Sequence, residues 1–138
     1  MKTLYTAEVT ATGGRIGHVR SSDGVIDMAV ALPEGLGGKK GSSNPEQLFA
    51  AGYASCFQSA LLVVAGRQHV HLDPQSTVTA HVDLNQLENG AYGLGVKLDI
   101  DLKDFDKEEG KKLVEEAHRI CPYSIGTRGN IEVKLNVV

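Results

Sequence analysis

The stretch NPEQLFAAGYASCFQSALLVVAG, residues 44–66, decides the fold of this 138-residue chain. Asn44 suits a helix N-cap, Pro45 suits the first helical position, and Glu46 suits the positive end of the helix dipole. No residue from position 47 to position 66 is charged, and apolar or small residues occupy every face. The stretch therefore predicts one long helix that is buried all round.

A membrane span is the competing interpretation of this stretch. Gln58 interrupts the apolar run, as do several Ser, Gly and Tyr residues, and one such span inside a β-rich chain is improbable. We therefore expect a core helix and no membrane partner. The opening residues lack the apolar segment of a secretory signal, so we expect a cytoplasmic protein.

The rest of the chain is organised around this helix as strands and one further helix. Alternating residues predict strands over 3–12, 18–22 and 25–32, a hairpin of 76–86 with 92–102, and a closing strand over 130–138. Asp106 followed by Glu109 predicts the start of a second helix, which Pro122 ends. The fold class is therefore α+β with largely antiparallel sheet, in one domain over 1–138. Because one small sheet cannot cover a helix without a polar face, a second copy of the chain is the simplest cover.

Composition excludes several classes of partner. The chain holds 14 Lys and Arg against 17 Asp and Glu, a net charge of −3, which makes it a poor nucleic-acid or anionic-membrane binder. With 4 Tyr, 3 Phe and no Trp, base stacking is also an improbable mechanism.

The two cysteines carry the remaining chemical possibilities. Cys56, in mid-helix, is either a small buried hydrophobe or a thiolate nucleophile, and the second role needs a cation from outside its own helix. Cys121 is either a packing residue at a helix end or a resolving thiol. His118 and Cys121 resemble half of a metal site, but two further ligands are not evident, so we expect no metal. Arg15, after a Gly-Gly turn, has the simple interpretation of a solvated arginine.

Longer motifs surround these residues. Asn44-Pro45-Glu46-Gln47 through Cys56-Phe57, Cys121-Pro122-Tyr123-Ser124 and Thr127-Arg128-Gly129-Asn130 together resemble the organic hydroperoxide resistance (Ohr) branch of the Ohr/OsmC family. Gly13-Gly14-Arg15 matches the same branch, and the resemblance covers the whole chain.

The resemblance implies a thiol peroxidase acting on organic hydroperoxides. Cys56 matches the peroxidatic cysteine and Cys121 the resolving one, while Arg15 and Glu46 match the pair that activates the first thiol. It also implies antiparallel sheets wrapped around long buried central helices in an intertwined homodimer. Lipoyl-type dithiols are the implied reductant, and no cofactor is implied.

The spacing of two of these residues bears on the dimer. Glu46 and Cys56 are ten residues apart, about 15 Å and 80° along one straight helix, so an arginine does not bridge them easily. If two copies of the helix cross antiparallel near Ala50-Ala51-Gly52, Glu46 of one chain approaches Cys56 of the other. A bent or later helix start would instead keep the site within one chain.

Two rival functions remain open from the sequence. The same dimer could bind an apolar ligand with both thiols inert. An OsmC-like stress protein with broader use of peroxides differs from the Ohr branch only in motif detail.

Overall fold

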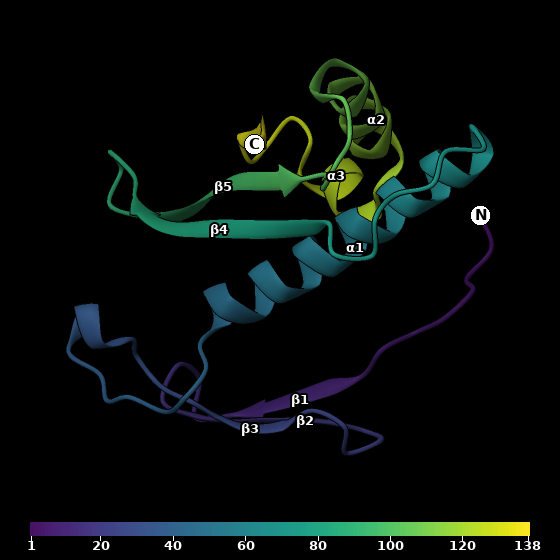
Figure 1. Cartoon of the computed structure of the whole chain (residues 1–138). Coiled ribbons are helices and arrows are strands. Elements are labelled where there is room, and N and C mark those ends of the chain that lie inside the picture. Colours follow the sequence, from purple (N-terminus) through teal and green to yellow (C-terminus); the bar gives the residue numbers. More distant parts are fainter. The chain divides into compact units, whose positions relative to one another are not determined.

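The computed structural model describes residues 1–138, which form two compact units, Met1–Leu48 and Phe49–Val138. The first unit holds three strands, β1 (Val9–Thr12), β2 (Gly17–Ser21) and β3 (Asp27–Val30), followed by a short 3-10 turn at Glu34–Leu36. The strands pair antiparallel in the order β1-β2-β3, so the predicted meander is confirmed (Figure 1).

The first strand is shorter than the alternation predicted. Residues 3–12 were expected to form it, but only Val9–Thr12 do. The reason is the length of its neighbour: β2 ends at a turn, and Ser22 N–H donating to the carbonyl of Glu8, at 3.0 Å, is the last ladder bond. An alternating sequence pattern thus indicates a preference for strand, whereas hydrogen bonding to a neighbouring strand determines where the strand begins and ends.

The first unit has almost no core of its own. Only Val30 and Asn44 are buried among its 48 residues. Four of its apolar side chains are each at least 72% exposed, namely Leu4, Tyr5, Ile16 and Val25. A sheet with this much uncovered apolar surface is typical of an interface.

Helix α1 (Pro45–Arg67) begins where the sequence predicted. The side-chain oxygen of Asn44 accepts a hydrogen bond from the Gln47 N–H at 2.8 Å, which is N-cap geometry. The helix is long and apolar enough to cross a membrane, a property that core helices of soluble proteins share.

The expectation that α1 is buried on every face is wrong for a single chain. One face is buried, through Tyr53, Phe57, Ala60, Leu61, Val64 and Ala65. The opposite face is exposed and is made of Ala51, Ser55, Ser59, Leu62, Val63 and Gly66. One small sheet covers only one side of a cylinder, so the second apolar face has no cover within this chain.

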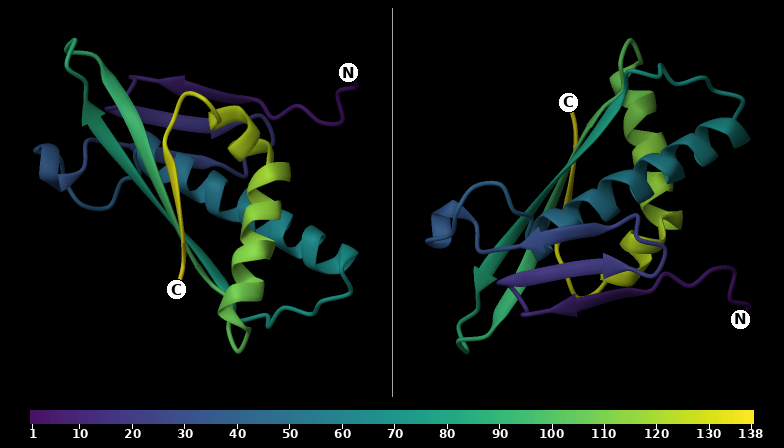
Figure 2. Two further views of the ribbon diagram at one scale, coloured as in Figure 1. Left: turned by 90° about the horizontal axis from the view of Figure 1, so that it is seen from above. Right: turned by 90° about the horizontal axis from the view of Figure 1, so that it is seen from below.

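The second unit is a three-stranded sheet with helices. Strands β4 (Thr77–Gln86) and β5 (Tyr92–Asp101) form the predicted hairpin, and β6 (Val133–Val137) joins β5 in parallel (Figure 2). Helices α2 (Lys107–Ile120) and α3 (Pro122–Thr127) make the crossover that a parallel pair requires. The sheets are antiparallel except for this pair.

The helix ends in this unit follow local chemistry. The Asp106 carboxylate accepts from the Glu109 N–H at 3.0 Å, confirming the predicted cap of α2. Pro122 ends α2 as expected, but it also starts α3, a short helix that the sequence did not indicate. Proline at a first helical position both stops one helix and permits the next.

The core of the second unit joins α1, α2 and the three strands. The buried face of α1 packs with Val96, Leu98 and Ile100 of β5 and with the apolar residues of α2. Cys121, fully buried, belongs to this core, and Cys56 lies at its edge. The core thus places both thiols in one packed layer.

Candidate active site

The two cysteines meet in the second unit. Cys56 lies on α1, and Cys121 lies at the corner where α2 ends and α3 begins. Their sulfur atoms are 3.6 Å apart, and both thiols are free. A disulfide would need the sulfurs to approach by only about 1.5 Å.

Backbone bonds hold Cys121 in this corner. Its N–H donates to the carbonyl of Ala117 at 2.8 Å, closing α2, and its own carbonyl accepts from the Ile125 N–H at 2.9 Å, opening α3. Pro122 has no N–H, so Tyr123 supplies the first free amide of α3. That amide lowers the pKa of the Cys56 thiol.

The surroundings of Cys56 in its own unit do not activate it. Burial raises the pKa of the Cys56 thiol; the Tyr123 amide opposes this, and the neighbouring Cys121 thiol adds to the increase. Since the thiolate is the reactive form, a cation must be added to this environment before Cys56 is a good nucleophile at neutral pH.

Such a cation is held in the first unit by a carboxylate. Arg15, on the turn between β1 and β2, donates through Nη1 to Glu46 Oε2 at 2.9 Å and through Nη2 to Glu46 Oε1 at 2.7 Å. The hydrogen bonds from Arg15 lower the pKa of the Glu46 carboxyl, and the same contact raises the pKa of Arg15. This two-pronged pair orients the guanidinium plane, while the Arg15 side chain stays 42% exposed.

The structure therefore groups the four predicted residues as two pairs, one in each unit. Arg15 meets Glu46, and Cys56 meets Cys121. Glu46 is the second residue of α1 and Cys56 the twelfth, so the predicted ten-residue spacing is a spacing within one helix.

An aromatic cluster lies beside the thiols. The ring of Tyr123 packs against Phe49 and Tyr53, with centroid distances of 5.9 and 5.5 Å. A Cβ atom at Gly52 would lie 2.4 Å from the Tyr123 hydroxyl oxygen, so the absence of a side chain there makes room for this ring. Gly52 thus has a packing role inside its own chain.

Sequence reasoning missed a group of buried and partly buried polar residues. Tyr53, Ser124, Thr127 and His118 are linked by hydrogen bonds next to the cysteine pair. His118, considered above as half of a metal site, is instead hydrogen-bonded to Ser124. The signal was present, since Ser124 and Thr127 are three residues apart and therefore share a face of a helix.

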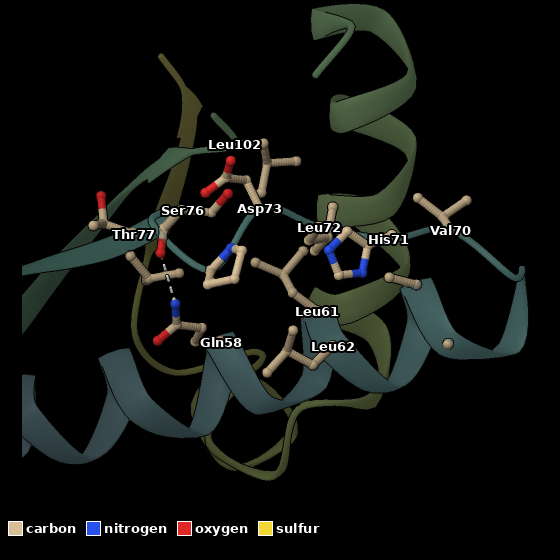
Figure 3. A pocket seen from close by; sticks show the side chains of 14 residues that line it. Gln58, Leu61, Leu62, Val70, His71, Leu72, Asp73, Ser76, Thr77 and Leu102 are labelled. Carbon is tan, nitrogen blue, oxygen red and sulfur yellow. Dashed lines mark hydrogen bonds between the residues drawn. The ribbon is translucent and has the colours of Figure 1, made fainter. Parts of the chain in front are cut away.

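A groove of about 570 Å³ lies over the second half of α1 (Figure 3). At its edge the Gln58 side chain donates to the carbonyl of Ser76 at 2.9 Å. Neither cysteine lines the groove. Leu62 does, and it also belongs to the exposed face of α1, so the groove continues that uncovered surface.

Comparison with known proteins agrees with the resemblance. The family model described as OsmC-like protein matches residues 37–136. The organic hydroperoxide resistance protein OhrB of Bacillus subtilis is 47% identical over 135 residues, covering 97% of this chain and 98% of the relative. The organic hydroperoxide resistance protein of Xanthomonas axonopodis pv. citri is 46% identical over 137 residues, covering 99% and 96%.

A solved structure extends this similarity to three dimensions. The crystal structure of an organic hydroperoxide resistance protein from Elizabethkingia anophelis superposes with a TM-score of 0.92 at 52% identity, covering 99% of this chain and 98% of that one. Full-length similarity at this level shows the family, and the chain belongs to the Ohr branch of the OsmC-like proteins.

Proposed function

We propose that this chain is a thiol peroxidase that reduces organic hydroperoxides, such as alkyl and lipid hydroperoxides, to alcohols in defence against oxidative stress. The observation that carries the proposal is the pair of free thiols 3.6 Å apart, one partly exposed and one buried. The relatives' names, organic hydroperoxide resistance proteins, support the substrate class.

The first step takes place at Cys56. Its thiolate attacks the outer oxygen of ROOH, an S–O bond forms as the O–O bond breaks, and the departing alkoxide takes a proton to give ROH. Cys56 is left as a sulfenic acid. The partial exposure of Cys56 admits the substrate, and the apolar residues around it favour hydroperoxides with an apolar chain.

Arg15 is proposed to activate this step. Its guanidinium would lower the pKa that burial raises at Cys56, and its N–H groups would donate to the peroxide oxygens. Glu46 would act as a positioning residue, because its paired hydrogen bonds set the plane of the guanidinium.

The second step uses Cys121. Its sulfur attacks the sulfenic acid, a disulfide forms and water leaves, so Cys56 is protected from further oxidation. A lipoyl-type dithiol is the proposed reductant of the disulfide, by thiol–disulfide exchange.

The chain is proposed to work as one domain in a homodimer in the cytoplasm. Two exposed apolar surfaces support the dimer. One is the exposed face of α1, and the other is formed by the exposed apolar side chains of the first unit, which buries almost no residues of its own. A second copy would cover both. In such a dimer, Arg15 and Glu46 of one protomer would serve Cys56 of the other, as the ten-residue spacing suggests.

The decisive test measures consumption of an alkyl hydroperoxide with dihydrolipoamide and, separately, thioredoxin as reductant. Wild type should turn over with dihydrolipoamide, while Cys56→Ser should be inactive because serine has no accessible anion at pH 7. Free thiols are counted after one equivalent of hydroperoxide. Loss of both thiols supports a peroxidase, and retention of both would instead indicate a protein that binds apolar ligands.

A further inference from the structure

A network of hydrogen bonds, buried at Tyr53 and Ser124 and partly buried at His118, connects three helices beside the cysteine pair. Tyr53 Oη of α1 is 2.8 Å from Ser124 Oγ of α3, and Ser124 Oγ is 2.8 Å from His118 Nδ1 of α2. The Tyr53 hydroxyl is also 3.4 Å from Thr127 Oγ1. Tyr53 and Ser124 are fully buried.

The residues of the hydrogen-bond network lie at regular spacings from the two cysteines. Tyr53 precedes Cys56 by three residues, and Ser124 follows Cys121 by three residues. The Tyr53–Ser124 bond therefore joins the same two segments as the sulfur contact, about one helical turn away. It ties α1 to the corner that carries Cys121.

A second bond closes that corner. His118 lies three residues before Cys121, so the His118–Ser124 contact spans Cys121 from one side to the other. Arg128 adds a further tie, since its Nη2 donates to the carbonyl of His118 at 2.7 Å. The Cys121 segment is thus held by side chains as well as by its helix-end bonds.

A polar network in this place is not needed to fill the core. Phenylalanine and alanine would occupy nearly the same space as Tyr53 and Ser124 without polar groups. Hydrogen bonds are directional, so a network in which each buried polar group has a partner fixes geometry in a way that apolar packing does not. Burial and the neighbouring Arg128 both lower the pKa of His118 and so disfavour the charged form of the imidazole beside its hydroxyl partner.

We propose that Tyr53, Ser124 and His118 are positioning residues that hold the Cys121 thiol against Cys56, so that the sulfenic acid is captured as a disulfide before a second hydroperoxide reaches it. The capture of a sulfenic acid rests on the proposed peroxidase function, whereas the positioning of Cys121 rests on the geometry of the hydrogen bonds.

Two reactions of the sulfenic acid compete. With Cys121 it gives the disulfide and water; with a second ROOH it gives the sulfinic acid and ROH. The first reaction is intramolecular, so its rate depends on how closely Cys121 is held, whereas the second depends on hydroperoxide concentration. Loosening the corner should therefore move the balance toward the sulfinic acid.

The experiment measures the effective concentration of the two thiols by equilibrating reduced protein with oxidised and reduced dithiothreitol. Tyr53→Phe and Ser124→Ala should each lower it about five- to tenfold, the effect of one or two hydrogen bonds. His118→Leu should behave likewise, and His118→Asn should recover part of the loss because its amide lies near the position of Nδ1.

Controls separate positioning from general stability. Tyr92→Phe removes a hydroxyl from an exposed tyrosine, and Ile100→Val weakens the same core without touching the network. Both should keep the wild-type effective concentration, even where Ile100→Val lowers Tm. In excess hydroperoxide, mass spectrometry should show more sulfinic acid at Cys56 in the network variants than in the controls.

The outcomes are distinct. Wild-type effective concentrations in both Tyr53→Phe and Ser124→Ala would overturn the proposal, as would equal loss in Ile100→Val. If wild type consumes no hydroperoxide, the proposed function fails, and the dithiothreitol equilibrium still decides the role of the network.

Discussion

Cys56 and Cys121 are 65 positions apart in the sequence, and their sulfur atoms lie 3.6 Å apart in the fold. Neither thiol has to travel for a disulfide to form, because a closure of about 1.5 Å is within the reach of small side-chain and backbone shifts. The two residues differ in exposure, since Cys121 is fully buried and Cys56 is partly exposed. In the proposed mechanism, the partly exposed thiol is therefore the one that meets the hydroperoxide.

Cys121→Ser should separate the two steps. The variant should complete a first turnover and then accumulate sulfinic acid at Cys56, because no thiol remains to capture the sulfenic acid. Mass spectrometry of the Cys56 peptide after excess hydroperoxide checks this. An unmodified Cys56 thiol in that sample would contradict the proposed division of roles.

Arg15→Ala should leave Cys56 in the environment that its own unit provides. Burial then governs, so the pKa of the thiol should be higher than in wild type and its reaction with hydroperoxide slower. Thiolate absorbance against pH measures the first quantity, and stopped-flow reaction with an alkyl hydroperoxide measures the second. An unchanged titration would refute the activating role.

Arg15→Lys is the matched control for charge. Lysine keeps the positive charge but loses the planar fork that makes two bonds to Glu46. We expect a rate below wild type, since both the hold on Glu46 and the peroxide contact weaken. A rate equal to wild type would show that charge alone is sufficient.

The Arg15–Glu46 pair should contribute stability that depends on pH. The pKa of Glu46 is lowered in the folded chain, mainly by the hydrogen bonds from Arg15. The contribution is therefore fully present above the ordinary glutamate pKa of about 4.3, and it is lost as pH falls through the lowered value. The difference in Tm between wild type and Glu46→Gln, measured from pH 7 downward, should shrink only below about pH 4. A difference that does not change with pH would contradict the pairing.

A mixed dimer should show whether sites are shared. Combining a Cys56→Ser chain with a Glu46→Ala chain leaves one Cys56, which in a shared site faces the intact Glu46 of the partner. That heterodimer should recover about half of the wild-type activity per dimer, as one of two sites is complete. Activity no higher per site than in the Glu46→Ala homodimer would place Glu46 with Cys56 of its own chain.

Local chemistry in the sequence was enough to determine much of the fold. Asn44 and Asp106 cap helices because their side-chain oxygens accept nearby amides, and alternation with an Asn-Gly turn is enough to predict the β4–β5 hairpin. The four candidate residues came from motifs that resemble a family, since no local pattern distinguishes a reactive cysteine from a buried one.

Tertiary structure decided the rest, because it depends on contacts between distant segments. Strand β1 begins only at Val9 because its partner strand β2 ends opposite that residue. A side chain at position 52 would clash with the ring of Tyr123, which packs there. Burial, which raises the pKa of Cys56, and the hydrogen bonds that join Tyr53, Ser124 and His118 arise only when α1, α2 and α3 pack together. Sequence determined which groups are available; the fold determined which of them meet, because hydrogen bonding and desolvation act over a few ångströms in space, whatever the distance along the chain.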